Sequence, residues 1–457
     1  TLREGNGGAL RFHGYGGSVV LRDVTVQQFT AERGAGAFVS GPALTVTDSV
    51  FDHNLANGLT SGTGGAVECY ECTLDVSQTT FSDNVAAVGG GAVLVRGYAT
   101  PTIAGSTFLR NTAPEGGAVY ATEARLRVNG GTFSGNTANY GGAFCLGPEN
   151  SQTWIEEAVI ADNVAALEGG GIYQYAEETA VLVARCRVSG NSALRGGGIL
   201  QDGGYLTVSQ SGIVNNVSSG TASGDGGAGL YGRQTAPAEG RVRIVNSTLS
   251  GNVAKRGGGG LYVAEDATAY LTSSTITDNT ANDTQVSSYG GGLWVHDTAT
   301  CSVGNTIIAG NEMIAPSAGG PYLYVPDVRG DIVSRGHNLI GIWSDLYTIG
   351  GEMTGDQVGS RTTPLDSGLD VLRLVDGCVF PKIGSVPYHP VLPVSRAVNT
   401  ADPAGIFMGP PDFSTVLTVD QCGNPRIQQG RGDIGAIESP YTRAWWPYAL
   451  YLPAVVR

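Results

Sequence analysis

The sequence lacks long hydrophobic runs, clusters of basic residues and an opening stretch of the kind that directs export. No segment approaches the roughly 18 consecutive apolar residues of a membrane helix, so no membrane span is predicted. No charged and then apolar segment opens the chain at Thr1, and we expect any export signal to have been removed or left out. The formal net charge is −14 at pH 7, and lysine occurs only at Lys255 and Lys382. Without a basic patch, nucleic acid is not an expected partner.

Charged residues are scarce, at 14% of the chain, whereas glycine is abundant, with 71 residues. The glycines do not follow a Gly-X-Y period, which excludes collagen. At 41% hydrophobic residues the chain has enough apolar side chains for a packed core, which excludes a disordered low-complexity chain. This composition favours a repeat architecture over ordinary α/β domains.

Two short motifs alternate along the first two thirds of the chain. The first is a pair of glycines followed by Ala or Gly and one apolar residue, and its copies end at Leu10, Val67, Val93, Val119, Phe144, Ile172, Ile199, Leu261 and Leu293, with looser copies at Phe38 and Leu230. The second is an apolar residue three places before an asparagine, and its asparagines are Asn54, Asn84, Asn111, Asn136, Asn163, Asn191, Asn216, Asn252, Asn279 and Asn311. The copies recur about every 28 residues, and the segments between them alternate with the two-residue period of strands.

A repeat of this length without a helical period predicts an all-β fold, a right-handed parallel β-helix (β-solenoid). Because one coil cannot bury its inward face alone, stacking on the next coil at a strand spacing of about 4.8 Å makes the core. We expect about 11 regular coils of about 28 residues, then irregular C-terminal coils and an extended tail. The expected division is regular coils over residues 1–313, an irregular region over 314–440 and a hydrophobic tail over 441–457.

The motif residues have structural roles in such a stack. We expect each asparagine to adopt the left-handed backbone conformation at a sharp corner, with its side-chain amide hydrogen-bonded from coil to coil. A ligand role for this asparagine column is the alternative. The glycine pairs are expected at a second corner where a Cβ would clash, and the Phe, Ile, Leu and Val residues are expected to fill the interior.

The alternation of Phe-x-x-Asn with Gly-Gly-Ala-(Val/Leu/Ile) resembles the repeats of the polymorphic outer membrane protein family, over about residues 1–313. The passenger regions of that family are β-helical surface adhesins, so the resemblance implies a β-helix displayed at a cell surface. In the C-terminal region, segments 334–341, 420–426 and 432–438 resemble the choice-of-anchor Q region of secreted bacterial β-helix proteins. This second resemblance implies anchoring at the cell surface and no particular reaction.

The last 14 residues form an apolar tail that contains Trp445, Trp446, Tyr448 and Tyr451. Its two prolines and its length exclude a membrane helix. Such a segment must pack on something, either its own solenoid or a neighbouring subunit. Because residues 1–4 run directly into the first glycine corner, we also expect an uncapped coil whose strand edges pair with another chain. The expected partner is therefore another copy of the chain, in a homo-oligomer or filament.

Seven cysteines in an exported chain favour disulfides. Cys378 and Cys422 lie outside the regular coils and are the first expected pair. Cys69 and Cys72 flank a short turn and can close on each other. A metal site at Cys69 and Cys72 would need two further ligands, which the nearby sequence does not supply.

The active-site patterns of the polysaccharide lyases and hydrolases that share this fold are missing from the sequence. The single Gly-His pair, at His337, has no pair of aspartates beside it. The coil acids Asp83, Asp162 and Asp278 stand singly beside the asparagine column, as solvated corner residues do. The sequence therefore predicts no enzyme, no catalytic residue, no cofactor and no metal site. A polysaccharide lyase or glycosidase is the alternative.

Two interpretations of function follow, both with an extracellular or cell-surface location. If the apolar residue after each glycine pair points inward, the next residue points outward, which gives an exposed column of Leu94, Tyr120, Tyr173, Leu200, Tyr231, Tyr262 and Trp294. A protein neighbour or the chain's own tail would bury such a column, which favours a structural protein that assembles into fibres or a surface layer. A cell-surface polysaccharide stacked on the aromatic residues is the alternative and would make the protein an adhesin or carbohydrate-binding β-helix. The longer loops 55–63, 217–226 and 280–290 share one corner, where a groove can bind a ligand.

Overall fold

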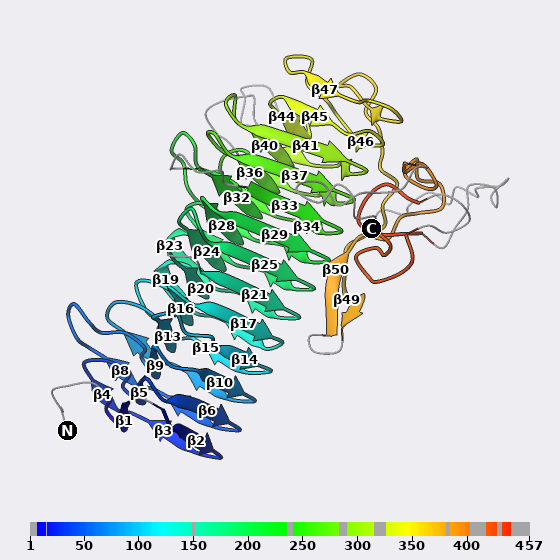
Figure 1. The fold of residues 1–457 in the computed structure, drawn as a ribbon. Helices are drawn as coiled ribbons and strands as arrows, with labels where there is room; N and C mark the ends of the chain where they lie inside the picture. Colours follow the sequence, from blue (N-terminus) through cyan, green and yellow to red (C-terminus); the bar gives the residue numbers. More distant parts are fainter. Residues whose placement is uncertain are drawn as a thin grey trace, which may run out of the picture.

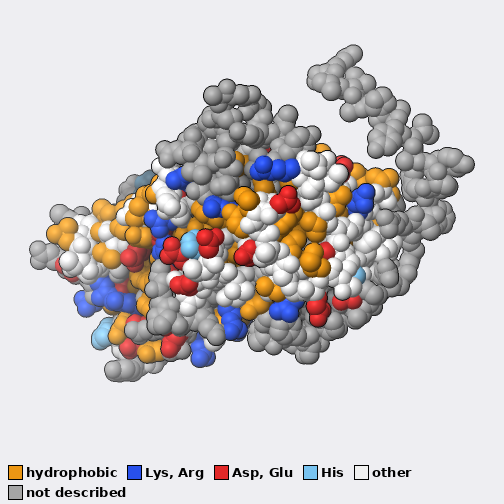
Figure 2. Space-filling view, turned by 90° about the horizontal axis from the view of Figure 1, so that it is seen from above, with side chains coloured by type: hydrophobic (Ala, Val, Ile, Leu, Met, Phe, Trp, Pro, Cys, Tyr) orange, Lys and Arg blue, Asp and Glu red, His pale blue; other side chains and the backbone are white. Residues whose placement is uncertain are grey.

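The computed structural model describes residues 7–14, 16–148, 151–234, 241–282, 290–314, 326–380, 384–402, 417–426 and 432–439. Within these ranges the chain forms strands and turns, and none of it forms a helix that could cross a membrane. Successive strands stack in parallel into a right-handed β-solenoid, as Figure 1 shows, so the predicted fold class is confirmed. Seen from above in Figure 2, acidic and basic side chains are interspersed among hydrophobic ones.

Each coil contributes to as many as four parallel sheets, numbered here in the order in which the chain enters them. The first sheet contains β1 (Leu10–His13), β5 (Ala37–Ser40), β9 (Val67–Tyr70), β13 (Val93–Arg96), β16 (Val119–Ala121), β20 (Phe144–Leu146), β24 (Ile172–Tyr175), β28 (Ile199–Asp202), β32 (Leu230–Arg233), β36 (Leu261–Val263), β40 (Leu293–Val295) and β44 (Val328–Arg329). The second contains β2 (Ser18–Arg22), β6 (Ala43–Thr47), β10 (Leu74–Ser77), β14 (Thr102–Ala104), β17 (Arg125–Asn129), β21 (Gln152–Glu156), β25 (Ala180–Ala184), β29 (Tyr205–Ser209), β33 (Arg241–Val245), β37 (Thr268–Thr272), β41 (Thr300–Gly304), β45 (Ile332–Ser334) and β47 (Ile349–Gly351).

The third sheet carries the Phe-x-x-Asn motif and contains β3 (Thr25–Gln27), β7 (Val50–Asp52), β11 (Thr80–Ser82), β15 (Thr107–Leu109), β18 (Thr132–Ser134), β22 (Val159–Ala161), β26 (Arg187–Ser189), β30 (Gly212–Val214), β34 (Thr248–Ser250), β38 (Thr275–Thr277), β42 (Ile307–Ile308), β46 (Leu339–Ile340) and β48 (Gln357–Val358). The fourth sheet follows the asparagine corner, is interrupted once along the stack, and contains β4 (Thr30–Ala31), β8 (Leu55–Ala56), β12 (Val85–Ala86), β19 (Thr137–Tyr140), β23 (Val164–Glu168), β27 (Ser192–Ala193), β31 (Val217–Ser218), β35 (Val253–Ala254), β39 (Thr280–Ala281) and β43 (Glu312–Met313).

The motif phenylalanines fill the interior in register from coil to coil. Phe81, Phe108 and Phe133 pair directly across neighbouring strands of the third sheet. Their rings stack at centroid distances of 4.7 and 4.6 Å, and all three are fully buried. Each ring fills the space beside the next, which explains why a bulky side chain recurs at the same position of the repeat.

A ladder of asparagine side chains runs along the corner after the third sheet. Asn136 Oδ1 accepts hydrogen bonds from the backbone N–H of Asn111 at 2.9 Å and from its Nδ2 at 3.0 Å. Asn136 Nδ2 donates to the Phe108 carbonyl at 3.1 Å and to Asn163 Oδ1 at 2.9 Å. Because these side chains are fully buried and hydrogen-bonded to one another, the column is structural and has no surface for a ligand.

The ladder asparagines do not adopt the left-handed conformation that the sequence predicted for them. The left-handed residue is the one immediately before each asparagine, as at Arg110 (φ 52°) and Asp162 (φ 56°), both of which point into solvent. That residue turns the chain so that the asparagine amide faces the interior. The ladder runs from Asn54 to Asn311, where Asp327 Oδ1 takes the place of a further asparagine and accepts two N–H donors at 2.7 and 2.9 Å.

Strand pairing continues beyond residue 313, into the region for which irregular C-terminal coils are predicted. Strands β44, β45 and β46 pair with the preceding coil, and β47 and β48 add a further partial coil up to Val358. The sequence motif is lost there because Asp327 replaces the ladder asparagine, while the strand pairing persists.

The rest of the described chain folds back along the outside of the third sheet, as Figure 1 shows. The antiparallel hairpin of β49 (Arg373–Phe380) and β50 (Gly384–Tyr388) contacts β26 and β30 of that sheet. Outward-facing Thr248, Thr275 and Ile307 are buried under the returning chain. In the N-terminal coils, the equivalent Thr80 and Thr107 are partly exposed.

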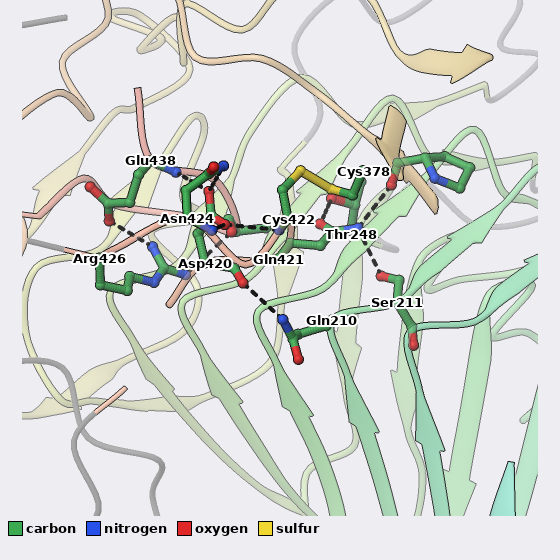
Figure 3. The surroundings of a disulfide bond; sticks show 12 residues. Gln210, Ser211, Thr248, Cys378, Asp420, Gln421, Cys422, Asn424, Arg426 and Glu438 are labelled. Carbon is green, nitrogen blue, oxygen red and sulfur yellow. Dashed lines mark hydrogen bonds and ion pairs between the residues drawn. A yellow bond between two sulfur atoms is a disulfide. The ribbon is translucent and has the colours of Figure 1, made fainter. Parts of the chain in front are cut away.

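Residues of the anchor-like segments make this contact, as Figure 3 shows. Gln421 Oε1 accepts a hydrogen bond from Thr248 Oγ1 at 2.7 Å. Arg426, which is fully buried, donates to Glu438 Oε1 at 3.0 Å and to the Ser273 carbonyl at 3.1 Å. In the part of the chain that the structure describes, these segments therefore hold the C-terminal region onto the solenoid.

Both predicted cysteine pairs form disulfides. Cys378 is bonded to Cys422, which ties β49 to the anchor-like segment 420–426, and Cys69 is bonded to Cys72 across a turn. The predicted assembly tail with its four aromatic residues, and the N-terminal residues 1–6, lie outside the described residues.

Candidate functional site

The residues after the glycine pairs form one outward column on the first sheet, but most of its predicted members are not exposed. Tyr231, Tyr262 and Trp294 pair in register, with ring centroids 5.0 and 4.0 Å apart. Their exposed fractions are 5%, 2% and 6%, and those of Leu94 and Leu200 are 2% and 0%. The prediction of an exposed apolar column is therefore wrong for these five residues.

The chain itself covers this part of the column. Ala281 and Met313 of the fourth sheet pack in one cluster with the column residues of β28, β32, β36 and β40. In the loop 217–226, the Gly224 carbonyl accepts a hydrogen bond from Tyr231 Oη at 3.0 Å. The sequence pattern gives the direction of each side chain, but it does not show that the segment after the asparagine corner folds over it.

Tyr120 and Tyr173 are the exceptions, because both are only partly buried. Tyr173 lines a cleft of about 330 Å³. We call this feature the tyrosine cleft and define it by its lining residues Glu115, Tyr140, Cys145, Glu168, Tyr173, Tyr175, Arg195 and Arg233. It lies between the first and fourth sheets, near the corner where the sequence placed the longer loops.

The tyrosine cleft is hollow because one coil carries small residues where its neighbours carry tyrosines. In the outward column, Cys145 lies between Tyr120 and Tyr173. Two residues later, Gly147 leaves room for a ring, since a Cβ at this position would lie 2.5 Å from Tyr175 Oη. Tyr175 therefore reaches across this coil to Tyr120, and their hydroxyl oxygens are 2.9 Å apart.

Three tyrosine rings form one wall of the cleft. The centroids of Tyr140 and Tyr173 are 5.3 Å apart, and those of Tyr173 and Tyr175 are 5.4 Å apart with nearly parallel rings. Burial raises the pKa of the Tyr173 and Tyr175 hydroxyls above the ordinary value, so both stay protonated at neutral pH. Partly exposed rings with hydroxyl groups suit a ligand that has an apolar face and a polar edge.

A network of ion pairs forms the other side of the cleft. The carboxylate of Glu168 accepts hydrogen bonds from Arg195 Nη1 at 2.9 Å and from Arg233 Nη1 at 2.7 Å. Arg195 also bonds Asp225 at 2.8 Å, and Arg233 also bonds Asp202 at 2.6 Å. Each guanidinium group is thus fixed by two carboxylates, and this side of the cleft is held in place before a ligand arrives.

Glu115 lines the cleft and is partly exposed. Its carboxylate makes no hydrogen bond or ion pair with any residue that the structure describes. It is therefore a free acceptor at the edge of the cleft. Sequence reasoning singled out none of the charged residues here, although Glu115, Glu168 and Arg195 each stand directly before a glycine pair of the repeat. Cys145, a small residue in an otherwise bulky outward column, was the available signal.

A larger groove of about 460 Å³ lies at the corner between the second and third sheets. Its lining residues are Gln78, Ala104, Gly105, Thr107, Asn129, Gly131, Thr132 and Val159. None of these is aromatic or charged. The tyrosine cleft, although smaller, offers both kinds of group and is the better candidate for a binding site.

One cluster among the described residues has the ligand types of a metal site. Single ligand atoms of Asp52, His53 and Asp83 all lie within 4.8 Å of one another. The group lies at the surface, and both oxygens of Asp83 accept hydrogen bonds from Arg110 at 2.9 and 2.7 Å. We interpret it as a surface ion-pair network and propose no metal there.

Comparisons with known proteins match the repeat region. Residues 35–232 match the family model described as a right handed beta helix region. A probable outer membrane protein, pmp6 of Chlamydia pneumoniae, is 27% identical over an aligned length of 173 residues; the match covers 31% of this chain and 12% of that protein. The metabotropic glutamate receptor-like protein R of Dictyostelium discoideum is 30% identical over 151 residues, 33% of this chain and 9% of that protein. The chain thus covers a small part of either relative. No solved structure matches it.

These comparisons agree with the strand order. The chain contains a right-handed β-helix region that resembles polymorphic outer membrane protein repeats. The matched residues include Glu115, Tyr140, Cys145, Tyr173 and Arg195, so most of the tyrosine cleft lies within the recognised repeat region.

Proposed function

We propose that this protein is an extracellular or cell-surface β-helix that binds a carbohydrate chain at the tyrosine cleft. The observation that carries the proposal is the wall formed by Tyr140, Tyr173 and Tyr175, which are partly exposed beside hydrogen-bonding groups already fixed in place. Aromatic rings pack on the apolar faces of sugar rings, while hydroxyl, carboxylate and guanidinium groups bond the sugar hydroxyls. The likeness to a bacterial outer membrane protein supports the surface location.

The shape of the cleft supports a polymer as the ligand. Its volume of about 330 Å³ is at the lower end of the range for small-molecule pockets and suits one sugar unit. The cleft is open and lies along the stack of β16, β20 and β24. Neighbouring units of a polysaccharide would therefore lie along the solenoid axis, over the adjacent coils.

The function proposed here is that of a binding protein rather than an enzyme. A glycosidase needs a carboxylic acid and a carboxylate that are free to act on the bond. Glu168 instead accepts hydrogen bonds from Arg195 and Arg233. Because the Glu168 carboxylate is already engaged in ion pairs, its role is to position the two arginines rather than to transfer a proton.

Assembly into fibres or a surface layer is a second proposal, and fewer observations support it. It depended on an exposed apolar column, of which five residues are buried within the chain itself. Its other support, the tail, lies outside the described residues. Electron microscopy of the full chain and of a chain without residues 444–457 tests it. Filaments formed equally by both would refute the role of the tail, and isolated molecules in both samples would refute assembly.

Carbohydrate binding is tested with an array of oligosaccharides probed by labelled protein. Tyr173→Ala removes the middle ring of the wall and should weaken binding about tenfold or more. The matched control is Tyr205→Ala, because Tyr205 is 47% exposed on the second sheet and is not among the residues that line the cleft. Tyr205→Ala should melt like the wild type, and Tyr173→Ala, which loses contacts with two rings, should melt at a lower temperature but keep the wild-type circular dichroism spectrum at the binding temperature. Absence of binding to any glycan, or an equal loss in both variants, would contradict the proposal.

A further inference from the structure

The charges around the tyrosine cleft do not balance. In the ion-pair network, the guanidinium groups of Arg195 and Arg233 are both bonded to carboxylates, those of Glu168, Asp202 and Asp225, so neither arginine offers an uncompensated positive charge. Glu115 lines the cleft and adds a negative charge, with no hydrogen-bond or ion-pair partner among the described residues. A ligand that enters the cleft therefore meets an excess of negative charge.

The aromatic wall of the cleft also favours a positively charged ligand. The face of a tyrosine ring carries partial negative charge and attracts a cation within about 6 Å of its centroid. Tyr173 lies between Tyr140 and Tyr175, at centroid distances of 5.3 and 5.4 Å, so a small cation beside it contacts more than one ring. The hydroxyl groups of Tyr173 and Tyr175 stay protonated because burial raises their pKa, so the wall itself is uncharged.

Arg195 and Arg233 do not reverse this preference for a positively charged ligand. Arg195 bonds both Glu168 and Asp225, and Arg233 bonds both Glu168 and Asp202. Their positive charges are thus already compensated by carboxylates at distances of 2.6 to 2.9 Å. An acidic sugar would have to compete with these carboxylates while its own charge is repelled by Glu115.

We infer that the tyrosine cleft selects an amino sugar, a hexosamine unit whose free amine is protonated. The ammonium group lies between the tyrosine rings and Glu115, and the sugar ring packs on Tyr173. This inference rests on the proposed carbohydrate binding and adds the class of sugar. It also gives Glu115 a role, as the counter-ion of the ligand.

The test compares three sets of oligosaccharides of equal length by isothermal titration calorimetry at low ionic strength: glucosamine, N-acetylglucosamine and galacturonic acid oligomers. The glucosamine oligomers should bind about tenfold more tightly than the N-acetylated ones, and the galacturonic acid oligomers most weakly. Added salt should narrow the difference, because it screens the partly exposed charge of Glu115.

Glu115→Gln should remove most of the preference for glucosamine oligomers over N-acetylglucosamine oligomers. The matched control, Glu312→Gln, changes an exposed glutamate in β43 of the same fourth sheet that is not among the residues lining the cleft, and it should have no effect. Equal affinity of the wild type for acetylated and free amino sugars would refute the selection while carbohydrate binding stands. Tightest binding of the acidic oligomers would also refute it. Failure of every oligosaccharide to bind would refute the proposed function itself.

Discussion

Replacing Asn136 by alanine removes one complete step of the asparagine ladder from the middle of the stack. Asn136 Oδ1 accepts two hydrogen bonds from Asn111, and Asn136 Nδ2 donates one to the Phe108 carbonyl and one to Asn163 Oδ1. The side chain is fully buried, so water is not at hand to replace these partners.

The loss of folding free energy depends on which polar groups lose their only hydrogen-bond partner. The Asn111 N–H donates to Asn136 Oδ1 at 2.9 Å and becomes an unsatisfied buried donor, whereas Asn111 Nδ2 still donates to the Phe81 carbonyl at 3.0 Å. Asn163 Oδ1 still accepts from the Asn136 backbone N–H at 3.0 Å. An orphaned buried donor costs about 1–3 kcal/mol and each further lost bond about 1 kcal/mol, so we expect a loss of about 3–5 kcal/mol.

The assay is chemical denaturation followed by circular dichroism, with Asn139→Ala as the matched control. Asn139 lies three residues further along the chain and is exposed, so its replacement should change stability by less than about 0.5 kcal/mol. Hydrogen exchange should also show the loss concentrated in the coils next to residue 136. Equal stability of the two variants would refute the ladder as a source of stability.

Four further outcomes are expected. Phe108→Ala should cost about 3–5 kcal/mol in denaturation, because its neighbours cannot collapse into the cavity, and unchanged melting would place the ring outside the core. Replacing Cys378 and Cys422 by serine opens a link with a sequence separation of 44 and should destabilise the C-terminal region by about 4 kcal/mol, seen as new proteolysis there while the coils stay protected. Burial raises the pKa of Asp327 from 3.8 to about 7, so between these two pH values the folded state keeps a proton that the unfolded chain has released. The free energy of unfolding should therefore fall as pH rises from 4 to 7. Asp327→Asn should remove this part of the pH dependence in melting scans. Incubation with pectin-like polymers should release neither unsaturated nor reducing ends, and a product that disappears when Glu115 or Glu168 is replaced would contradict the assignment as a binding protein.

The sequence was sufficient to predict the β-helix because the repeat is local and strict. Each coil repeats an inward apolar residue and a ladder asparagine, and parallel in-register pairing turns that periodicity directly into stacked columns. Prediction of the disulfides succeeded for a different reason. Cys378 and Cys422 stand outside the repeat, and Cys69 and Cys72 flank a turn, so few pairings were available.

The candidate site was only partly predictable, because it depends on how loops fold over the outward face. The alternation of strands indicates that Tyr173 and Tyr262 both point outward, and both do. It does not indicate that Tyr262 is covered by the fourth sheet while Tyr173 stays accessible beside Cys145.

The left-handed corner residue was predicted one position too late, because only the conformational preference of asparagine was considered. Asparagine favours that conformation, but the buried ladder uses its amide for four hydrogen bonds. The preceding residue therefore adopts the left-handed conformation, and its type varies, as at Arg110, Asp162 and Gly135.

The most direct test of carbohydrate binding at the tyrosine cleft is a crystal structure of the protein with a short glucosamine oligomer. The account predicts one sugar ring packed on Tyr173, with its amine between the tyrosine rings and the Glu115 carboxylate, and an unchanged network around Glu168. An oligomer bound instead in the larger groove beside Thr107 and Val159, with no sugar in the tyrosine cleft, would contradict it.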